Sequence, residues 1–155
     1  MQTQTITNSK LLQYITDLRN EISEQTVLLE KITKLETVDI VSINTLKLQI
    51  QTKIIDLKHY QYIIQKNNFD NTVIYKDKDY CVFELIKIKE KYIMEMQLSE
   101  LIVKTESKDE KFLHLALKSY QEVIDYKKAI SEIQSILNKF NNTFQTTLDN
   151  PKENT

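Results

Sequence analysis

Apolar residues recur every three or four positions along most of the chain, which is the spacing of one face of an α-helix. The first stripe predicts a helix over residues 9–36, and either Asn8 or Ser9 can cap its start. Its apolar positions are Leu11, Ile15, Leu18, Ile22, Leu29, Ile32 and Leu35. Gln25 stands where the same stripe would carry another apolar residue.

A β-branched join over residues 37–42 separates this helix from a second one that extends to about residue 66. Asp39 or Ser42 opens the second helix, and the alternative is one bent helix that continues through the join. The second stripe consists of Ile43, Leu46, Ile50, Ile54, Leu57, Tyr60 and Ile64.

The segment 67–72 is the clearest break, because Asn and Asp tolerate the left-handed conformation and can replace glycine at a helix end. Asn67, Asn68, Asn71, Asn141 and Asn142 are the residues expected to do so. Residues 73–83 then allow two interpretations. They form a small β-hairpin, or Asp77 or Asp79 caps the next helix. We favour the cap, because the turn of the hairpin would lack glycine.

A third helix is predicted over residues 79–105, with an apolar surface wider than a narrow seam. The residues from Ser107 to Glu110 have the pattern of a capping box and predict a fourth helix over residues 108–148, which Asn141–Thr143 can end early. The face of the fourth helix is marked by Leu113, Leu117, Tyr120, Ile124, Ile130, Ile133, Leu137, Phe140 and Phe144. Lys127 interrupts this stripe.

Together these helices predict an all-α fold. It is an elongated antiparallel four-helix bundle or a set of long helical hairpins, with a small β-hairpin between the second and third helices as the alternative to a helix cap there. We expect a single domain over residues 9–148, between a flexible N-terminus (1–8) and a C-terminal tail (149–155).

Composition narrows the function. The chain has no glycine, which excludes glycine-rich phosphate loops and nucleophile elbows. The net charge of −1 gives no general attraction to nucleic acid or to anionic membranes. We therefore expect no nucleic-acid partner. The sequence also lacks an apolar run long enough for an integral membrane segment, and no signal peptide is visible, so a cytoplasmic location is expected.

Residues that could carry chemistry are few. His59 and His114 lack the Glu-x-x-His spacing of a di-iron bundle, and Cys81 has no histidine placed beside it by the sequence. Lysines interleaved with tyrosines over residues 75–92 could bind nucleic acid, but acidic residues among them nearly cancel the charge. The sequence therefore predicts no catalytic residue, no metal site and no cofactor.

Aromatic residues gather around the connection between the second and third helices. Tyrosine is enriched at interfaces because its ring can be buried while its hydroxyl stays in water. We predict a partner-binding surface formed by Tyr60, Tyr62, Phe69, Tyr75, Tyr80 and Tyr92.

Further apolar residues lie outside the primary stripes and need to be covered. They are Ile40, Val41, Leu48, Ile55, Ile63, Ile88, Leu98 and Leu115. Pairing of the wide face of the third helix with a second chain would cover part of this surface. The sequence thus favours a non-enzymatic helical interaction protein that forms a homo-oligomer, most simply a dimer, and binds a protein partner. The alternative is a small all-α inhibitor or immunity-type protein that neutralises one partner.

Part of the chain resembles a known family. Residues 64–68 close a long helix, a connection containing Thr72 follows, and residues 84–87 open the next helix. Together with residues 133–138 and Asn142-Thr143, this arrangement is similar to the septicolysin-like family of small bacterial helical proteins. The resemblance spans about residues 50–145. It implies an all-α bundle and no established catalytic residues.

Overall fold

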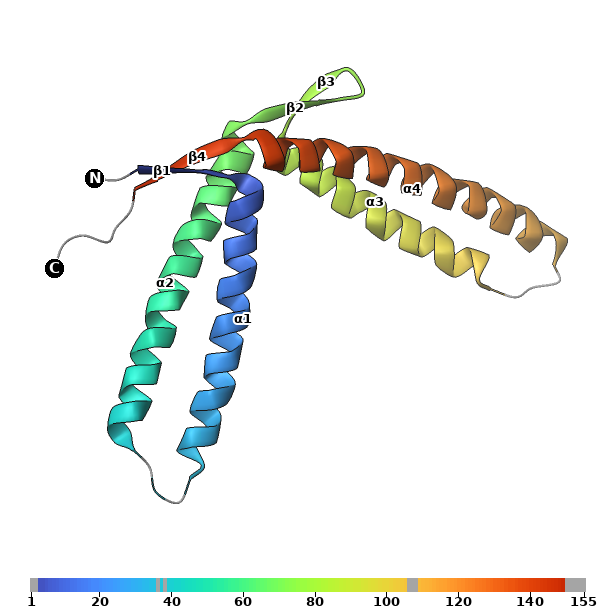
Figure 1. The fold of residues 1–155 in the computed structure, drawn as a ribbon. Helices are drawn as coiled ribbons and strands as arrows, with labels where there is room; N and C mark the ends of the chain where they lie inside the picture. The colour runs from blue at the N-terminus through green and yellow to red at the C-terminus, as the bar shows by residue number, and fades with distance from the viewer. Residues whose placement is uncertain (1–2, 36, 38, 106–108, 150–155) are drawn as a thin grey trace. The chain divides into compact units, whose positions relative to one another are not determined.

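The computed structural model describes residues 3–35, 37, 39–105 and 109–149. Within them lie four helices and four short strands, which Figure 1 labels. In chain order the elements are β1 (Thr3–Thr7), α1 (Asn8–Thr33), α2 (Ile40–Asp70), β2 (Thr72–Tyr75), β3 (Lys78–Cys81), α3 (Val82–Val103), α4 (Glu110–Thr143) and β4 (Gln145–Asp149).

The helices pack as two antiparallel hairpins, α1 with α2 and α3 with α4 (Figure 1), so the predicted all-α hairpin architecture is confirmed. The chain divides into two compact units. The first unit holds residues up to Asn67 and from Asn141 onwards, and the second holds Asn68–Phe140. The sequence predicted one domain over residues 9–148, and the structure distributes these residues between the two units.

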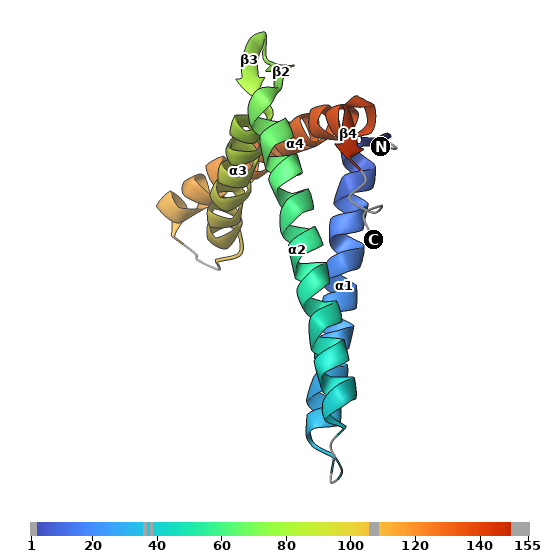
Figure 2. The same ribbon diagram turned by 90° about the vertical axis from the view of Figure 1, so that its left-hand side faces the viewer.

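In the first unit, α1 and α2 lie side by side along their lengths (Figure 2). The predicted stripes supply the core: Leu11 and Ile15 of α1 and Leu46 and Ile50 of α2 are buried. Gln25 is half-buried at its stripe position. The helix begins one residue earlier than predicted, because the Thr7 Oγ1 atom accepts a hydrogen bond from Lys10 N at 3.2 Å.

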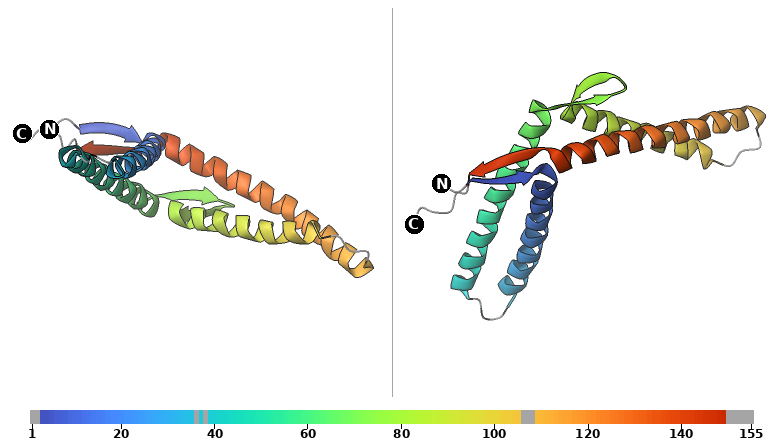
Figure 3. Two further views of the ribbon diagram at one scale, coloured as in Figure 1. Left: turned by 90° about the horizontal axis from the view of Figure 1, so that it is seen from below. Right: turned by 45° about the horizontal axis from the view of Figure 1, so that its top comes forward.

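The first unit also contains two paired strands that the sequence pattern did not predict. β1 pairs antiparallel with β4, from Thr3 opposite Asp149 to Thr7 opposite Gln145 (Figure 3). The prediction of a flexible segment over residues 1–8 is therefore wrong for β1. The prediction that the last helix reaches residue 148 is also wrong, since α4 ends at Thr143. The alternative end at 141–143 is confirmed.

Asp39 caps α2, which decides between the two predicted openings of this helix. Its Oδ1 atom accepts hydrogen bonds from Val41 N at 3.0 Å and Ser42 N at 3.3 Å. The Ser42 hydroxyl donates to the same carboxylate. These bonds stabilise the charged form, foremost the bond from the Ser42 side chain, and hold the pKa of Asp39 below its ordinary value of 3.8.

We predict that this cap is lost in acid. A lowered pKa means that the cap stabilises α2 above pH 3.8 and loses its effect as the pH falls through the folded-state pKa. NMR titration should therefore show the Val41 and Ser42 amide signals moving together below that pH. In Asp39→Asn the same signals should not follow a carboxyl titration. Wild-type amides that stay unmoved down to the acid limit would contradict the cap.

In the second unit, β2 and β3 form the small hairpin that the sequence left as an alternative. The favoured helix cap at Asp77 or Asp79 is wrong, since α3 begins at Val82. Tyr75, at the end of β2, is buried in the core of this unit beside Val82 and Leu85 of α3 and Ile133 and Leu137 of α4. Burial of this ring explains how the hairpin forms without glycine.

The turn of the hairpin uses non-glycine residues in the left-handed region. Tyr75 pairs with Lys78, so Lys76 and Asp77 form a two-residue turn with φ angles of 50° and 61°. These two are the positive-φ residues within the described part of the chain. The prediction that the five asparagines replace glycine in this conformation is therefore wrong. Asn67 and Asn68 lie inside α2, and Asn141 and Asn142 lie inside α4.

Relief of this backbone strain should stabilise the protein. A left-handed residue with a Cβ atom costs roughly 1–2 kcal/mol. Lys76→Asn/Asp77→Gly should raise the free energy of unfolding by about 1 kcal/mol. Loss of the Lys76 ammonium, 5.2 Å from the centre of the Tyr75 ring, offsets part of the gain. Urea denaturation measures the change. Asp79→Gly in β3 is the control and should destabilise, and equal effects of the two variants would contradict the turn.

The caps of the second unit follow local sequence. Glu84 reaches back to accept a hydrogen bond from Cys81 N at 3.0 Å at the start of α3. At α4, Asp109 Oδ1 accepts from Lys111 N at 2.8 Å, and the helix begins at Glu110. Ser107, the predicted N-cap residue of the capping box, lies outside the described residues.

Candidate interaction surface

α4 exposes the apolar stripe that was predicted to be its buried face. Its members recur at spacings of 4, 3 and 4 residues. This α4 stripe consists of Leu113 (51% exposed), Leu117 (68%), Tyr120 (56%) and Ile124 (44%). Residues at such spacings form one seam along a helix, as in coiled coils. The prediction that these four residues face the core is therefore wrong, although Ile133 and Leu137 further along the helix are buried as predicted.

Small and polar residues replace them at the contact between α3 and α4. Ser119 and Ser99 are both buried, and Ala116 is half-buried. Ser99 Oγ donates a hydrogen bond to Glu122 Oε2 at 3.0 Å, which links the two helices. Since small side chains fill this part of the contact, the larger apolar residues of α4 remain on the surface.

The sequence contains a signal that identifies this inward face. Nine of the buried and half-buried positions of α4 follow one unbroken series of alternating 4- and 3-residue steps. They are Phe112, Ala116, Ser119, Val123, Tyr126, Ile130, Ile133, Leu137 and Phe140. This series has no slip at Lys127. The predicted stripe does have one, because it joins an exposed seam to a buried one.

α2 carries a second exposed apolar face, in the first unit. Val41, Leu48, Ile55 and Tyr62 are seven residues apart and between 63% and 73% exposed. A seven-residue step returns to almost the same side of a helix. These four residues, the α2 line, therefore follow one side of α2, away from its buried positions Leu46 and Ile50.

α3 contributes a shorter exposed face. Met94, Leu98 and Leu101 are each about two-thirds exposed and lie at spacings of 4 and 3 residues. The expectation that apolar residues outside the primary stripes lack cover is confirmed for Leu98 and Leu115 in this unit. It is also confirmed for Ile40 and for three members of the α2 line, Val41, Leu48 and Ile55, whereas Ile63 and Ile88 are half-buried.

The six predicted partner-binding aromatics have different environments. Tyr62 is 63% exposed and Phe69 is 56% exposed. The Phe69 ring stacks on Phe83 with centroids 4.3 Å apart. Both therefore present apolar area on the surface of their own unit, Tyr62 on the first and Phe69 on the second.

The other four aromatics pack against neighbours. Tyr60 is half-buried with its ring 6.3 Å from that of Tyr14, and burial, more than the nearby Asp56, raises the pKa of its hydroxyl. Tyr75 lies in the core, and the half-buried Tyr80 ring is 6.2 Å from it. Tyr92, also half-buried, has its ring 5.7 Å from Tyr126 of α4. These contacts give all four a role in packing.

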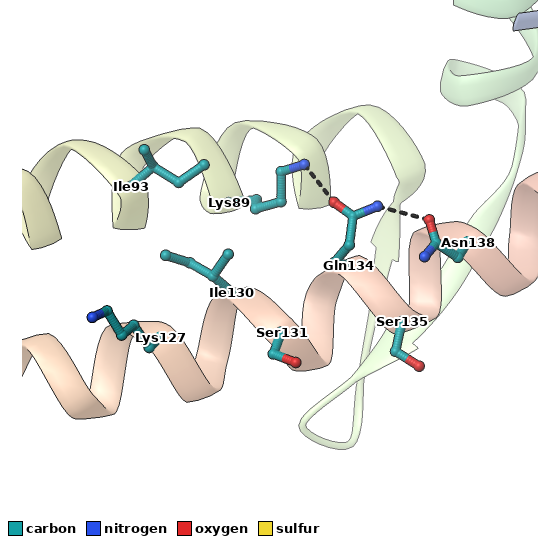
Figure 4. Close-up of a pocket in the computed structure, with 8 residues that line it drawn as sticks. All are labelled: Lys89, Ile93, Lys127, Ile130, Ser131, Gln134, Ser135 and Asn138. Carbon is teal, nitrogen blue, oxygen red and sulfur yellow. Dashed lines mark hydrogen bonds between the residues drawn. The ribbon is translucent and has the colours of Figure 1, made fainter.

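A groove of about 520 Å³ lies on the second unit between α3 and α4 (Figure 4). Lys89 Nζ donates to Gln134 Oε1 at 2.8 Å, and Gln134 Nε2 donates to Asn138 Oδ1 at 2.7 Å. Lys127, at the other end, lies 3.8 Å from Glu100. Lys89, Gln134 and Asn138 therefore bind one another, and Lys127 is paired with Glu100, so these four side chains are already engaged within the unit.

Residues considered for catalysis stay apart. His59 packs its ring 5.9 Å from that of Tyr60, and His114 is exposed. Cys81 is half-buried at the start of α3, where its Sγ atom lies 3.3 Å from the carbonyl oxygen of Asn68. Across the residues that the structure describes, no three His, Cys, Asp or Glu side chains gather as a metal site would require. No helix in that part of the chain is both long and apolar enough to cross a membrane.

Comparison with protein-family models, curated proteins and solved structures found no match to this chain. The resemblance to the septicolysin-like family stays a prediction. The features of the described residues that point to a function are the exposed apolar faces of α2, α3 and α4.

Proposed function

We propose that this chain is a non-enzymatic helical interaction protein that self-associates and binds a protein partner through exposed apolar faces of its helices. The observation that supports this most is the α4 stripe: four large apolar side chains in one seam, each 44% or more exposed. Burial of apolar surface contributes roughly 25 cal/mol per Å². Contiguous exposed apolar patches on a protein mark interaction sites.

The α2 line supports the same proposal from the first unit. Its leucine, isoleucine and valine are exposed, and Tyr62 adds the aromatic side chain that protein interfaces favour. We assign partner binding to this line, with Tyr62 as its aromatic contact. Phe69 is the corresponding exposed aromatic residue of the second unit.

Substitution on the α2 line tests partner binding. Leu48→Lys/Ile55→Lys should leave the helical content unchanged, since both side chains are more than 60% exposed, and should abolish partner capture. Capture from native lysate, with mass determination of the complex, measures this. Leu46→Ala is the matched control: it removes a buried leucine, so it should lower stability and retain the partner.

Self-association is measured by light scattering over a range of concentrations. We expect the wild-type mass to rise from that of a monomer toward that of a dimer. A monomeric mass throughout, together with identical captured proteins for wild type and the Leu48→Lys/Ile55→Lys variant, would overturn the proposed function.

A further inference from the structure

The α4 stripe is bounded by opposite charges. Glu110 precedes Leu113 by three residues, and Lys127 follows Ile124 by three residues. The steps along the whole series are therefore 3, 4, 3, 4 and 3, which read the same in both directions. Glu110 is exposed, and the Lys127 side chain is 63% exposed.

This symmetry of spacing fits a second copy of the same helix that runs antiparallel. In that arrangement Leu113 lies opposite Ile124 of the second copy, and Leu117 lies opposite its Tyr120. A two-fold interface repeats each such pair, so every apolar residue of the stripe finds an apolar neighbour.

Charge complementarity selects this direction over the parallel one. Antiparallel pairing places Glu110 of each copy opposite Lys127 of the other, which gives two attractive pairs. Parallel pairing places Glu110 against Glu110 and Lys127 against Lys127. Among the described residues Lys127 forms a long contact, 3.8 Å from Glu100, and its exposed ammonium can turn toward a second carboxylate.

We propose that a second copy of this chain binds the α4 stripe antiparallel, through Leu113, Leu117, Tyr120 and Ile124, with Glu110 and Lys127 as reciprocal ion pairs. This inference rests on the proposed function and names α4 as the surface of self-association. Four side chains per copy make a small interface, below the roughly 1,200 Å² of stable complexes. The dimer is therefore weak and dependent on concentration.

Sedimentation equilibrium of the full chain tests the surface. Leu117→Lys should weaken the dimer about 100-fold, since each copy loses an apolar contact worth about tenfold. Its side chain is 68% exposed, so the fold survives, which circular dichroism checks. Leu98→Lys on α3 is the matched control, because Leu98 is 63% exposed in the same unit. It should leave the dimer intact.

A charge exchange tests the direction. Glu110→Lys and Lys127→Glu should each weaken the dimer, because each creates two like-charged pairs. The double variant Glu110→Lys/Lys127→Glu should restore it to within about threefold of wild type. In a parallel dimer each position faces its own counterpart, so wild type and all three variants keep two like-charged pairs, and neither single change should weaken the dimer. Thermal denaturation of each variant separates loss of pairing from loss of fold.

The outcomes distinguish this inference from the proposed function. A wild-type dimer that survives Leu117→Lys and dissociates in Leu98→Lys overturns the α4 interface, while self-association stands with α3 as its surface. A dimer that dissociates in Leu117→Lys overturns the antiparallel direction if neither single charge change weakens it, or if the double variant fails to restore it. A wild-type chain that stays monomeric while it captures a partner through the α2 line overturns the inference and leaves partner binding in place.

Discussion

Ile133→Ala is expected to lower the free energy of unfolding by about 3 kcal/mol, within the range for deletion of buried isoleucine side chains. Ile133 is fully buried in the core of the second unit, among Tyr75, Leu85 and Leu137. Truncation removes its apolar contacts and leaves a cavity that the surrounding helices can fill only in part. Urea denaturation measures the change, and hydrogen exchange should show faster exchange in α3 and β2.

Ile124→Ala is the matched control on the same helix. Ile124 is 44% exposed as a member of the α4 stripe, so the same truncation should cost less than about 1 kcal/mol. The two variants together test which face of α4 packs inward. If Ile124→Ala destabilises the chain as much as Ile133→Ala, the helix presents its other face, and the α4 stripe is part of the core.

The sequence-based prediction of which face of α4 packs inward was wrong over the first half of the helix. The sequence predicts Leu113 and Leu117 in the core because large apolar residues usually occupy it. The structure instead packs Ala116 and Ser119 inward. Hydrophobicity alone cannot rank these alternatives, because small residues gain contacts only when the helices approach closely. The series of positions whose 4- and 3-residue steps continue without a break past Lys127 predicts the inward face of α4 correctly.

The helices themselves could be predicted because their signal is local. Leu11, Ile15, Leu46 and Ile50 lie on stripes that need no knowledge of distant residues, and all four are buried as expected. The pairing of β1 with β4 has no such signal. It joins Thr3 to Asp149 at opposite ends of the chain, and both strands are rich in threonine and poor in apolar residues.

The β-hairpin shows a different limit. The absence of glycine disfavours the two-residue turn of the hairpin, but it does not take account of contacts made by the strands. Tyr75 makes such a contact, since its side chain is 5% exposed and lies in the core. A tertiary contact therefore compensates for local strain at Lys76 and Asp77. The same contact explains why Tyr75, predicted as a partner-binding residue, lies inside its unit.

A second large effect is expected from Asn67→Ala, in the first unit. Asn67 Nδ2 donates to Asn8 Oδ1 at 2.7 Å and to Thr146 Oγ1 at 2.7 Å, so it ties α2 to the start of α1 and to β4. Asn8 is fully buried. Its Oδ1 atom would lose this donor and remain away from water. We expect a loss of about 2–3 kcal/mol, because a buried acceptor left without its bond is not compensated by solvent.

Three comparisons make this prediction specific. Asn20→Ala removes an exposed asparagine from α1 and should change stability by less than about 0.5 kcal/mol. Asn8→Ala/Asn67→Ala should cost less than the sum of the single changes, because both remove the same bond. Hydrogen exchange should also report faster exchange at β1, whose pairing with β4 this bond supports. If Asn67→Ala is no more destabilising than Asn20→Ala, the buried bond does not hold β4 and the two helices together.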